Sequence, residues 1–295
     1  MSITAQDVKA LREKTGAGMM DCKKALQESN GNMDEAIDFL KKQGLAKAVK
    51  KGDRVAAEGL IFTKVGSGEA ALVELNCETD FVAKNDDFIN LGNKIAESIL
   101  AQKPSSLEEA LKLSLGEQTI EEAINSAIAV IGEKISLRRF ELFSAKESGD
   151  ITLYDHNGGK IAVLIETLGE KVVDVARDVA MQIAAMAPQY LDASEVSQEV
   201  LDKEKEVQIE LLKQEGKPEN MIEKIVQGKL NKFAGEISLL QQVYVKDMGG
   251  KKKVADVIKE TDANGKVVQF CRYAVGEGIE KKQDDFADEV AKMAQ

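Results

Sequence analysis

The stretch that defines this chain is Asn76-Cys77-Glu78-Thr79-Asp80-Phe81-Val82-Ala83-Lys84-Asn85. The residues before it alternate between apolar and polar types up to Cys77, which predicts a β-strand. Residues 86–100 after it carry apolar side chains at helical spacing, and Asn85 is suited to cap that helix. We therefore expect residues 79–82 in the turn between a strand and a helix.

Phe81 is a large apolar residue in a turn whose neighbours are mostly polar. Its side chain either packs back into the core or points outward for insertion into another molecule. The residue type alone favours the core, because buried aromatic side chains are common. Both directions stay open at this point.

Length and composition describe a globular protein. The 295 residues can form two or three domains, and 43% hydrophobic and 31% charged residues are typical of a soluble, helix-rich chain. Apolar runs fall short of the roughly 20 residues that a membrane helix needs. Residues 1–7 carry neither a signal-peptide core nor an Arg-rich transit pattern. Cys22, Cys77 and Cys271 lack metal-ligand spacing, so we expect reduced thiols in the cytoplasm.

The charge is unevenly distributed. The net charge of −11 argues against a surface that grips a nucleic-acid backbone. Residues 1–54 hold 11 Lys/Arg and 8 Asp/Glu, a net +3, so the rest of the chain carries −14. A basic module joined to an acidic body explains this difference, and so does an ordinary solvated face rich in lysine.

The first 45 residues predict three short helices. Thr4 can cap the first, Gly16 and Gly18 end it, and the others are expected over 19–29 and 34–43. Three helices of this size resemble a ubiquitin-associated module, a fold used for binding. Residues 41–54 contain six basic residues and one acid, which favours an exposed linker.

The body of the chain predicts a repeated order of elements. Strands are expected over 57–64 and 70–76, helices over 86–100 and 106–131, and a strand over 134–143. Strands over 151–156 and 160–166 and a helix over 172–186 then repeat the order strand, turn, strand, helix. We interpret this as an internal duplication that gives two α/β subdomains.

Two highly charged helices follow, over 196–214 and 218–233, each with a thin apolar stripe. They predict an antiparallel helical hairpin that serves as a surface for a partner or for self-association. A helix over 254–259, a strand over 267–275 and an amphipathic helix from about residue 283 complete the chain.

The predicted class is α+β. The expected domains are a basic helical module (1–54), core subdomains (55–143; 144–188 with 234–263), a coiled-coil hairpin (189–233) and a C-terminal module (264–295).

Residues for enzyme chemistry are scarce. His156 is the single histidine, and Cys77 continues an apolar strand face, which favours a buried thiol over a Cys–His nucleophile pair. The paired glycines 16/18, 66/68 and 276/278 lack the third glycine of a dinucleotide loop, and Gly250-Lys251 lacks the P-loop pattern. With no Trp and 4% aromatics, a stacking surface for single strands is also disfavoured. We expect no enzyme activity, cofactor, metal site or direct nucleotide binding.

Two long motifs carry a family resemblance. LREKTGAGMMDCKKAL at residues 11–26 and NCETDFVAK at residues 76–84 are similar to the two signatures of the translation elongation factor Ts family. The segment VGEGIEK at residues 275–281 and the order of modules extend the resemblance over the whole chain.

The resemblance implies a guanine nucleotide exchange factor that binds elongation factor Tu–GDP, promotes GDP release and stabilises the nucleotide-free partner until GTP binds. In the family, Thr79, Asp80, Phe81 and Val82 match the turn that dislodges magnesium beside the nucleotide. The resemblance thus reverses the expectation for Phe81 and directs it outward.

Further partner contacts are implied at Arg12, Met19, Met20 and His156. The hairpin matches the family's coiled-coil arm, which is tied to homodimer formation. The alternative function is a non-catalytic interaction scaffold that binds a partner without affecting any nucleotide.

Overall fold

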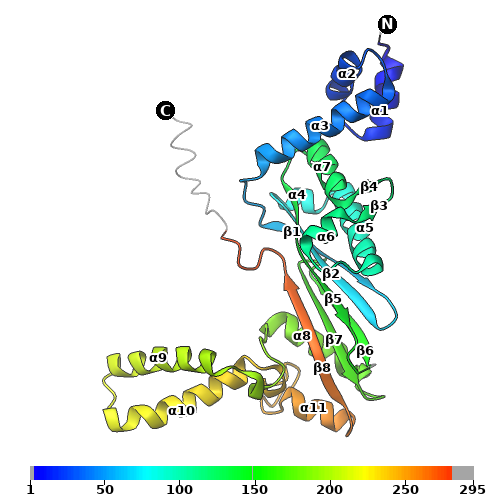
Figure 1. Cartoon of the computed structure of the whole chain (residues 1–295). Helices are drawn as coiled ribbons and strands as arrows, with labels where there is room; N and C mark the ends of the chain where they lie inside the picture. Colours follow the sequence, from blue (N-terminus) through cyan, green and yellow to red (C-terminus); the bar gives the residue numbers. More distant parts are fainter. Residues whose placement is uncertain (1–2, 148, 281–295) are drawn as a thin grey trace. The chain divides into compact units, whose positions relative to one another are not determined.

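The computed structural model of the protein describes residues 3–147 and 149–280 (Figure 1). It is a mixed structure of helices and sheets, in agreement with the α+β class. The described residues form two compact units, one of residues 3–64, 71–142 and 273–280, the other of residues 65–70 and 143–272. The helix predicted from about residue 283 and the end of the VGEGIEK motif lie outside the described residues.

Three helices begin the first unit: α1 (Ala5–Thr15), α2 (Met19–Glu28) and α3 (Met33–Lys51). Thr4 caps α1 as predicted, in a capping box where its N–H donates to Asp7 at 2.9 Å and the Asp7 N–H donates back at 3.2 Å. Gly16 ends the helix with φ = 68°, a left-handed conformation that glycine adopts without strain. The buried side chains between the helices are Val8, Leu11, Cys22, Ala25, Leu26 and Ala36. The likeness to a ubiquitin-associated module stays a prediction.

The linker predicted over residues 41–54 is wrong for most of its length. α3 continues through it to Lys51, because Lys, Ala, Leu and Gln favour helix and because the helix packs against α7 (Ile120–Ile131). Gly44 is buried at this contact, where an added Cβ would lie 3.3 Å from the Ala129 Cβ. The basic residues therefore extend from a helix, and only residues 52–57 connect it to the first strand.

The first sheet has the strand order β1 (Glu58–Val65), β2 (Glu69–Cys77), β5 (Ile135–Ser144), with β2 in the centre, close to the predicted bounds. Helix α5 (Asp86–Gln102), capped by Asn85 as predicted, packs on it. Phe62 and Phe88 lie with ring centroids 5.9 Å apart in this core. Gly92 of α5 lies against the Phe62 ring, so the helix approaches the sheet closely.

The helix predicted over 106–131 is also partly wrong. Helix α6 (Leu107–Lys112) ends early, and a short hairpin of β3 (Ser114–Leu115) and β4 (Gln118–Thr119) separates it from α7. Gly116 makes the turn with φ = 77°, and Thr119 starts α7 with a capping box to Glu122. Local turn and cap signals prevail over the apolar content of the stretch.

The second unit contains a sheet in the order β6 (Asp150–His156), β7 (Ile161–Leu168), β8 (Lys266–Ala274). Helices α8 (Val173–Met186) and α11 (Val254–Thr261) contribute to the same core as this sheet. The strands and helices predicted here are confirmed with small shifts at their ends. The internal duplication inferred from their order stays a prediction.

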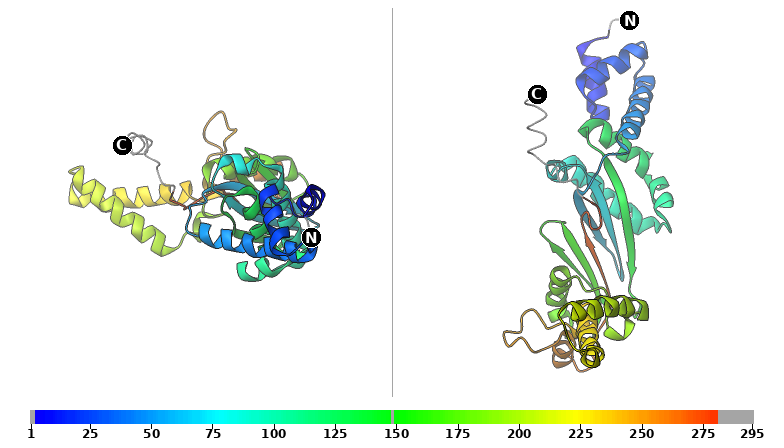
Figure 2. Two further views of the ribbon diagram at one scale, coloured as in Figure 1. Left: turned by 90° about the horizontal axis from the view of Figure 1, so that it is seen from above. Right: turned by 90° about the vertical axis from the view of Figure 1, so that its left-hand side faces the viewer.

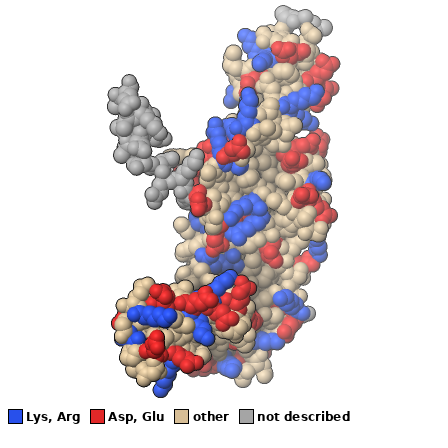
Figure 3. Space-filling view, turned by 60° about the vertical axis from the view of Figure 1, so that its left-hand side comes forward, with Lys and Arg blue, Asp and Glu red and all other residues tan. Residues whose placement is uncertain are grey.

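Helices α9 (Gln198–Gln214) and α10 (Glu219–Glu236) form a pair that extends away from the sheet of its own unit (Figure 2). Short 3-10 turns, η1 (Ala193–Glu195) and η2 (Leu239–Gln241), flank the pair. The buried contacts between the helices are Leu212, Ile222, Val226 and Leu230. Acidic and basic residues are interspersed along both helices, and Figure 3 shows both colours on the face of the pair that it presents. Both predicted helices are thus confirmed. Their apolar stripes are only partly buried in the seam, because Val207, Leu211 and Met221 are exposed.

Within the described residues, no helix combines the length and the apolar character needed to cross a membrane.

Candidate functional site

The 79–82 turn is ordered as one turn of helix. β2 ends at Cys77, and Thr79 caps the four-residue helix α4 (Asp80–Ala83). The Thr79 hydroxyl accepts the Val82 N–H at 3.4 Å, and the Thr79 carbonyl accepts the Ala83 N–H at 3.3 Å. The expected connection between strand and helix is confirmed in position, but it has helical rather than open-turn geometry.

The side chains of this single helical turn point in two directions. Ala83 is 2% exposed in the core, and Val82 packs against the same core while partly exposed. Phe81 points the other way and is 80% exposed. Its outward direction, which the resemblance implied and the residue type disfavoured, is confirmed. Most of the Phe81 side chain is therefore available to another molecule.

Polar contacts around the turn join it to neighbouring residues and to the loop before β5. Asp80 pairs with Lys84 at 2.7 Å, an exposed contact one helical turn long that contributes little to stability. The Thr79 N–H and hydroxyl both donate to the Glu133 carboxylate, at 3.0 and 2.7 Å. Cys77 is fully buried, and its Sγ donates to the Thr79 carbonyl at 3.1 Å. The thiol is thus buried, as its strand position indicated.

The predicted docking residues of the N-terminal module are exposed. Arg12 lies on α1, and Met19 and Met20 begin α2 with 56% and 75% of their surface exposed. Methionine adapts its shape to a partner more readily than branched side chains do. These three residues and Phe81 belong to the same unit.

Sequence analysis missed two further apolar residues of this unit. Leu45 and Val49 are exposed on α3, one helical turn apart, among lysines. Their spacing of four residues was a readable signal, but it lay in the segment interpreted as a linker.

His156 is the last residue of β6 and belongs to the second unit. It is exposed, pairs across the hairpin with Ile161, and its Nδ1 lies 3.0 Å from the Tyr154 hydroxyl. The structure therefore places it on a strand end beside the Asn157-Gly158-Gly159 turn. Its role toward a partner stays a prediction.

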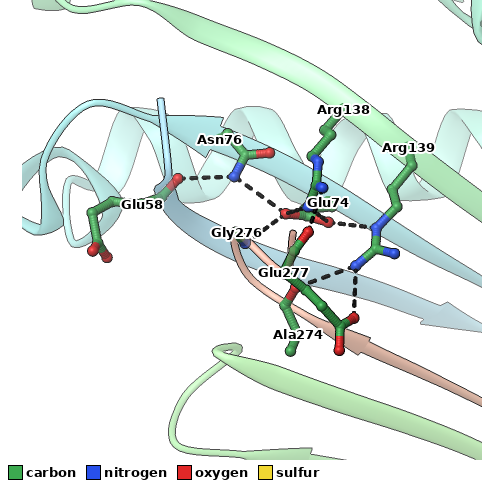
Figure 4. Close-up of polar contacts among 8 residues, drawn as sticks. All are labelled: Glu58, Glu74, Asn76, Arg138, Arg139, Ala274, Gly276 and Glu277. Carbon is green, nitrogen blue, oxygen red and sulfur yellow. Dashed lines mark hydrogen bonds and ion pairs between the residues drawn. The ribbon is translucent and has the colours of Figure 1, made fainter. Parts of the chain in front are cut away.

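The strand that leads into the turn is anchored by a buried carboxylate at its centre (Figure 4). Glu74 of β2 has no exposed surface and accepts bonds from Arg138 at 2.9 and 3.1 Å, from Arg139 at 2.6 Å and from the Gly276 N–H at 2.8 Å. Burial by itself raises the pKa of Glu74. The Gly276 N–H and the two guanidinium groups outweigh this effect, so the pKa lies below the ordinary value. Glu74 is thus held ionised.

The same network fastens the chain after β8 to the first sheet. Arg139 donates to the Ala274 carbonyl at 3.3 Å and pairs with Glu277 at 3.4 Å, and its guanidinium lies 4.1 Å from the centre of the Tyr273 ring. Gly276 adopts φ = 70° there, and an added Cβ would lie 2.4 Å from the Ala57 carbonyl oxygen, so glycine suits this position on both counts. The segment 274–277 is therefore fixed beside the strand that carries the 79–82 turn.

Among the residues that the structure describes, no group of three or more His, Cys, Asp and Glu side chains is arranged to hold a metal ion.

A family model described as elongation factor TS matches residues 78–277, about two thirds of the chain. The match starts one residue before Thr79 and ends at Glu277, so it includes the 79–82 turn, β5 of the first sheet, the whole second sheet and the helical hairpin. The chain therefore belongs to the elongation factor Ts family, the nucleotide exchange factors of elongation factor Tu.

Proposed function

We propose that this protein accelerates GDP release from elongation factor Tu by inserting Phe81, carried on the 79–82 turn, beside the bound nucleotide. Asp80 and Val82 accompany it, and the insertion displaces the magnesium ion. The protein then stabilises the nucleotide-free partner until GTP binds. The observation that carries this proposal is the 80% exposure of Phe81 on a helical turn that is capped and packed on its other side.

The mechanism follows from how a GTPase holds its nucleotide. The phosphates are bound by backbone N–H groups and by a magnesium ion that neutralises their charge. A side chain that shifts the magnesium ligands leaves the phosphate charge less compensated. Because Phe81 is already fixed on its helical turn, it loses little conformational freedom on insertion. More of the free energy of its contacts with the partner is then available to weaken nucleotide binding.

A broad interface is needed to drive this displacement. Each tenfold loss of nucleotide affinity requires about 1.4 kcal/mol of coupling energy. We therefore assign Arg12, Met19 and Met20 to docking on the partner, with His156 as a further contact, and the α9–α10 pair to self-association of two copies. The cytoplasm, where translation elongation takes place, is the proposed site of action.

The test is the release of fluorescently labelled GDP from elongation factor Tu at fixed magnesium concentration. Phe81→Ala should lower the maximal acceleration by about tenfold or more, as expected when an interface anchor is removed. It should cost little folding stability, because an exposed ring leaves no cavity. Met248→Ala is the matched control, since it removes a fully exposed apolar side chain from the other unit.

Three outcomes are informative. Acceleration that depends on Phe81 supports the insertion mechanism. If the acceleration does not depend on Phe81, the protein is still an exchange factor, but its docking residues cause the exchange. Tight binding to the partner without any acceleration favours the scaffold.

A further inference from the structure

The loop between α7 and β5, residues 132–134, lies against the end of β2. Two consecutive loop residues bond two consecutive residues of the strand end. Thr79 donates its N–H and its hydroxyl to the two Glu133 oxygens at 3.0 and 2.7 Å. In the opposite direction, the Lys134 N–H donates to the Glu78 carboxylate at 2.6 Å. Residues 78 and 79 are therefore bound to the loop both by donors of Thr79 and by the accepting carboxylate of Glu78.

The Glu133 bonds complete the hydrogen bonding of Thr79. Its hydroxyl proton is committed to Glu133, so an oxygen lone pair is left for the Val82 N–H at 3.4 Å. Its carbonyl accepts the Ala83 N–H at 3.3 Å and the Cys77 thiol at 3.1 Å. Every polar group of Thr79 is thus engaged within the chain, which fits a residue that orients the turn.

The orientation of α4 depends on such outside support. A helix of four residues is too short to be stable alone, because the hydrogen bonds of one turn do not offset the entropy cost of nucleating a helix. Its direction is set by its cap and by the packing of Ala83 and Val82. Bonds to a carboxylate are about twice as strong as bonds between neutral groups, so Glu133 is the strongest single restraint on Thr79.

The same loop also holds the end of the basic helix α3. Lys134 Nζ donates to the Gly52 and Arg54 carbonyls at 2.6 and 2.9 Å, and Lys51 bonds the Gly132 carbonyl. Arg54 in turn pairs with Glu78 at 3.2 Å. Through residues 132–134, the last residues of the N-terminal helices and the 79–82 turn are fixed to one another.

We propose that Glu133 is a positioning residue of the exchange site, whose carboxylate orients Thr79 and thereby fixes the direction in which α4 presents Phe81. This inference rests on the proposed insertion of Phe81. Glu133 lies outside the 79–82 turn, in a loop 54 residues after Thr79, and its task is to accept hydrogen bonds from that residue.

The primary variant is Glu133→Ala, measured by labelled GDP release from elongation factor Tu over a range of concentrations of this protein. Without the carboxylate, Thr79 loses two bonds and α4 samples other directions. The maximal release rate should fall about tenfold, while the concentration for half-maximal effect changes little, because docking through Arg12, Met19 and Met20 is untouched. Glu133→Gln keeps one acceptor oxygen, so its loss should be smaller. Glu121→Ala, at the exposed start of α7, is the control.

A double-mutant cycle tests whether Glu133 acts through Phe81. In a Phe81→Ala background, Glu133→Ala should cause no further loss of the maximal rate. Independent, multiplicative losses would overturn the inference, since Glu133 would then act by another route. A lowered melting temperature or weakened partner binding with an unchanged maximal rate would also overturn it, by showing a merely structural role.

Hydrogen exchange gives a readout that does not depend on the partner. The Thr79 amide should exchange about tenfold faster in Glu133→Ala than in the parent protein, while core amides of β2 keep their protection. Unchanged Thr79 exchange would overturn the proposed restraint. If Glu133→Ala does not fold, Glu133→Gln is measured in its place, with the same expected direction.

The failure of this inference is distinguishable from that of the proposed function. If Phe81→Ala leaves the release rate intact, the insertion mechanism fails, and the role of Glu133 fails with it. If Phe81→Ala lowers the rate but Glu133→Ala does not, only the positioning role is overturned.

Discussion

Two buried glutamates hold the C-terminal strand region, each within its own unit. Glu74 of β2 accepts the Gly276 N–H at 2.8 Å, and Glu166 of β7 accepts the Gln269 side chain at 2.8 Å. Burial raises the pKa of Glu166, but the backbone N–H groups of Lys146, Glu147 and Gly149 and the Gln269 amide lower it below the ordinary value. The hydrogen bonds that the folded chain provides therefore keep both carboxylates ionised.

A pH dependence of stability follows from the lowered pKa of Glu74. The unfolded state takes up this proton at a higher pH than the folded state, so the stabilising effect is complete above the ordinary value of about 4.5. It is lost as the pH falls through the lower pKa of the folded state. Glu74→Gln should destabilise the protein by about 1–3 kcal/mol at pH 7, because two guanidinium groups lose a charged acceptor. Urea unfolding of both proteins between pH 3 and 7 measures this.

The difference between the two proteins should be constant at neutral pH and should shrink in acid. A difference that stays constant down to pH 3 would contradict the assigned ionisation. Glu141→Gln, on the exposed side of β5, is the control and should change stability little at any pH.

At the scale of elements, two helical glycines predict opposite effects of the same substitution. Gly92→Ala in α5 should destabilise the protein by about 1–3 kcal/mol, because its Cβ would lie 2.1 Å from the Phe62 ring. Gly228→Ala in α10 should stabilise it by about 0.5–1 kcal/mol, because no atom lies within 4 Å and alanine favours helix. Denaturant unfolding compares the two. Equal signs would show that propensity alone, without packing, decides both positions.

Elements with local signals could be predicted from the sequence, and elements that depend on distant contacts could not. Thr4 and Asn85 mark helix starts by their own side chains, so those starts were found. α3 was cut short because its continuation depends on packing of Gly44 against α7, some 80 residues away. The β3–β4 hairpin is the exception: its local signals, Gly116 and the Thr119 capping box, were readable, but the apolar content of residues 106–131 was interpreted as one helix.

The candidate site, too, could be predicted only where its signals are local. The position of Phe81 came from the local pattern, but its direction came from the family resemblance, since residue type alone favoured the core. Glu133 and the bond from Glu74 to Gly276 escaped prediction because their partners lie 54 and 202 residues apart, beyond any periodicity. Tertiary contacts of this kind leave no pattern in a single sequence.

At the scale of the whole molecule, the proposed exchange reaction requires the protein and GDP to weaken each other's binding to elongation factor Tu. Linkage fixes the two effects as equal: the factor by which this protein raises the Kd of GDP is the factor by which GDP raises the Kd of this protein. Both affinities can be measured by titration calorimetry at fixed magnesium, with and without the third component.

Phe81→Ala should shrink this common factor while leaving the affinity for the nucleotide-free partner mostly in place, because the remaining docking residues are unchanged. A shrinkage of one decade corresponds to about 1.4 kcal/mol of coupling assigned to one side chain. Met248→Ala should leave the factor unchanged. If GDP does not alter the affinity of the parent protein for elongation factor Tu, the two ligands are uncoupled, and insertion beside the nucleotide is not the mechanism of this protein.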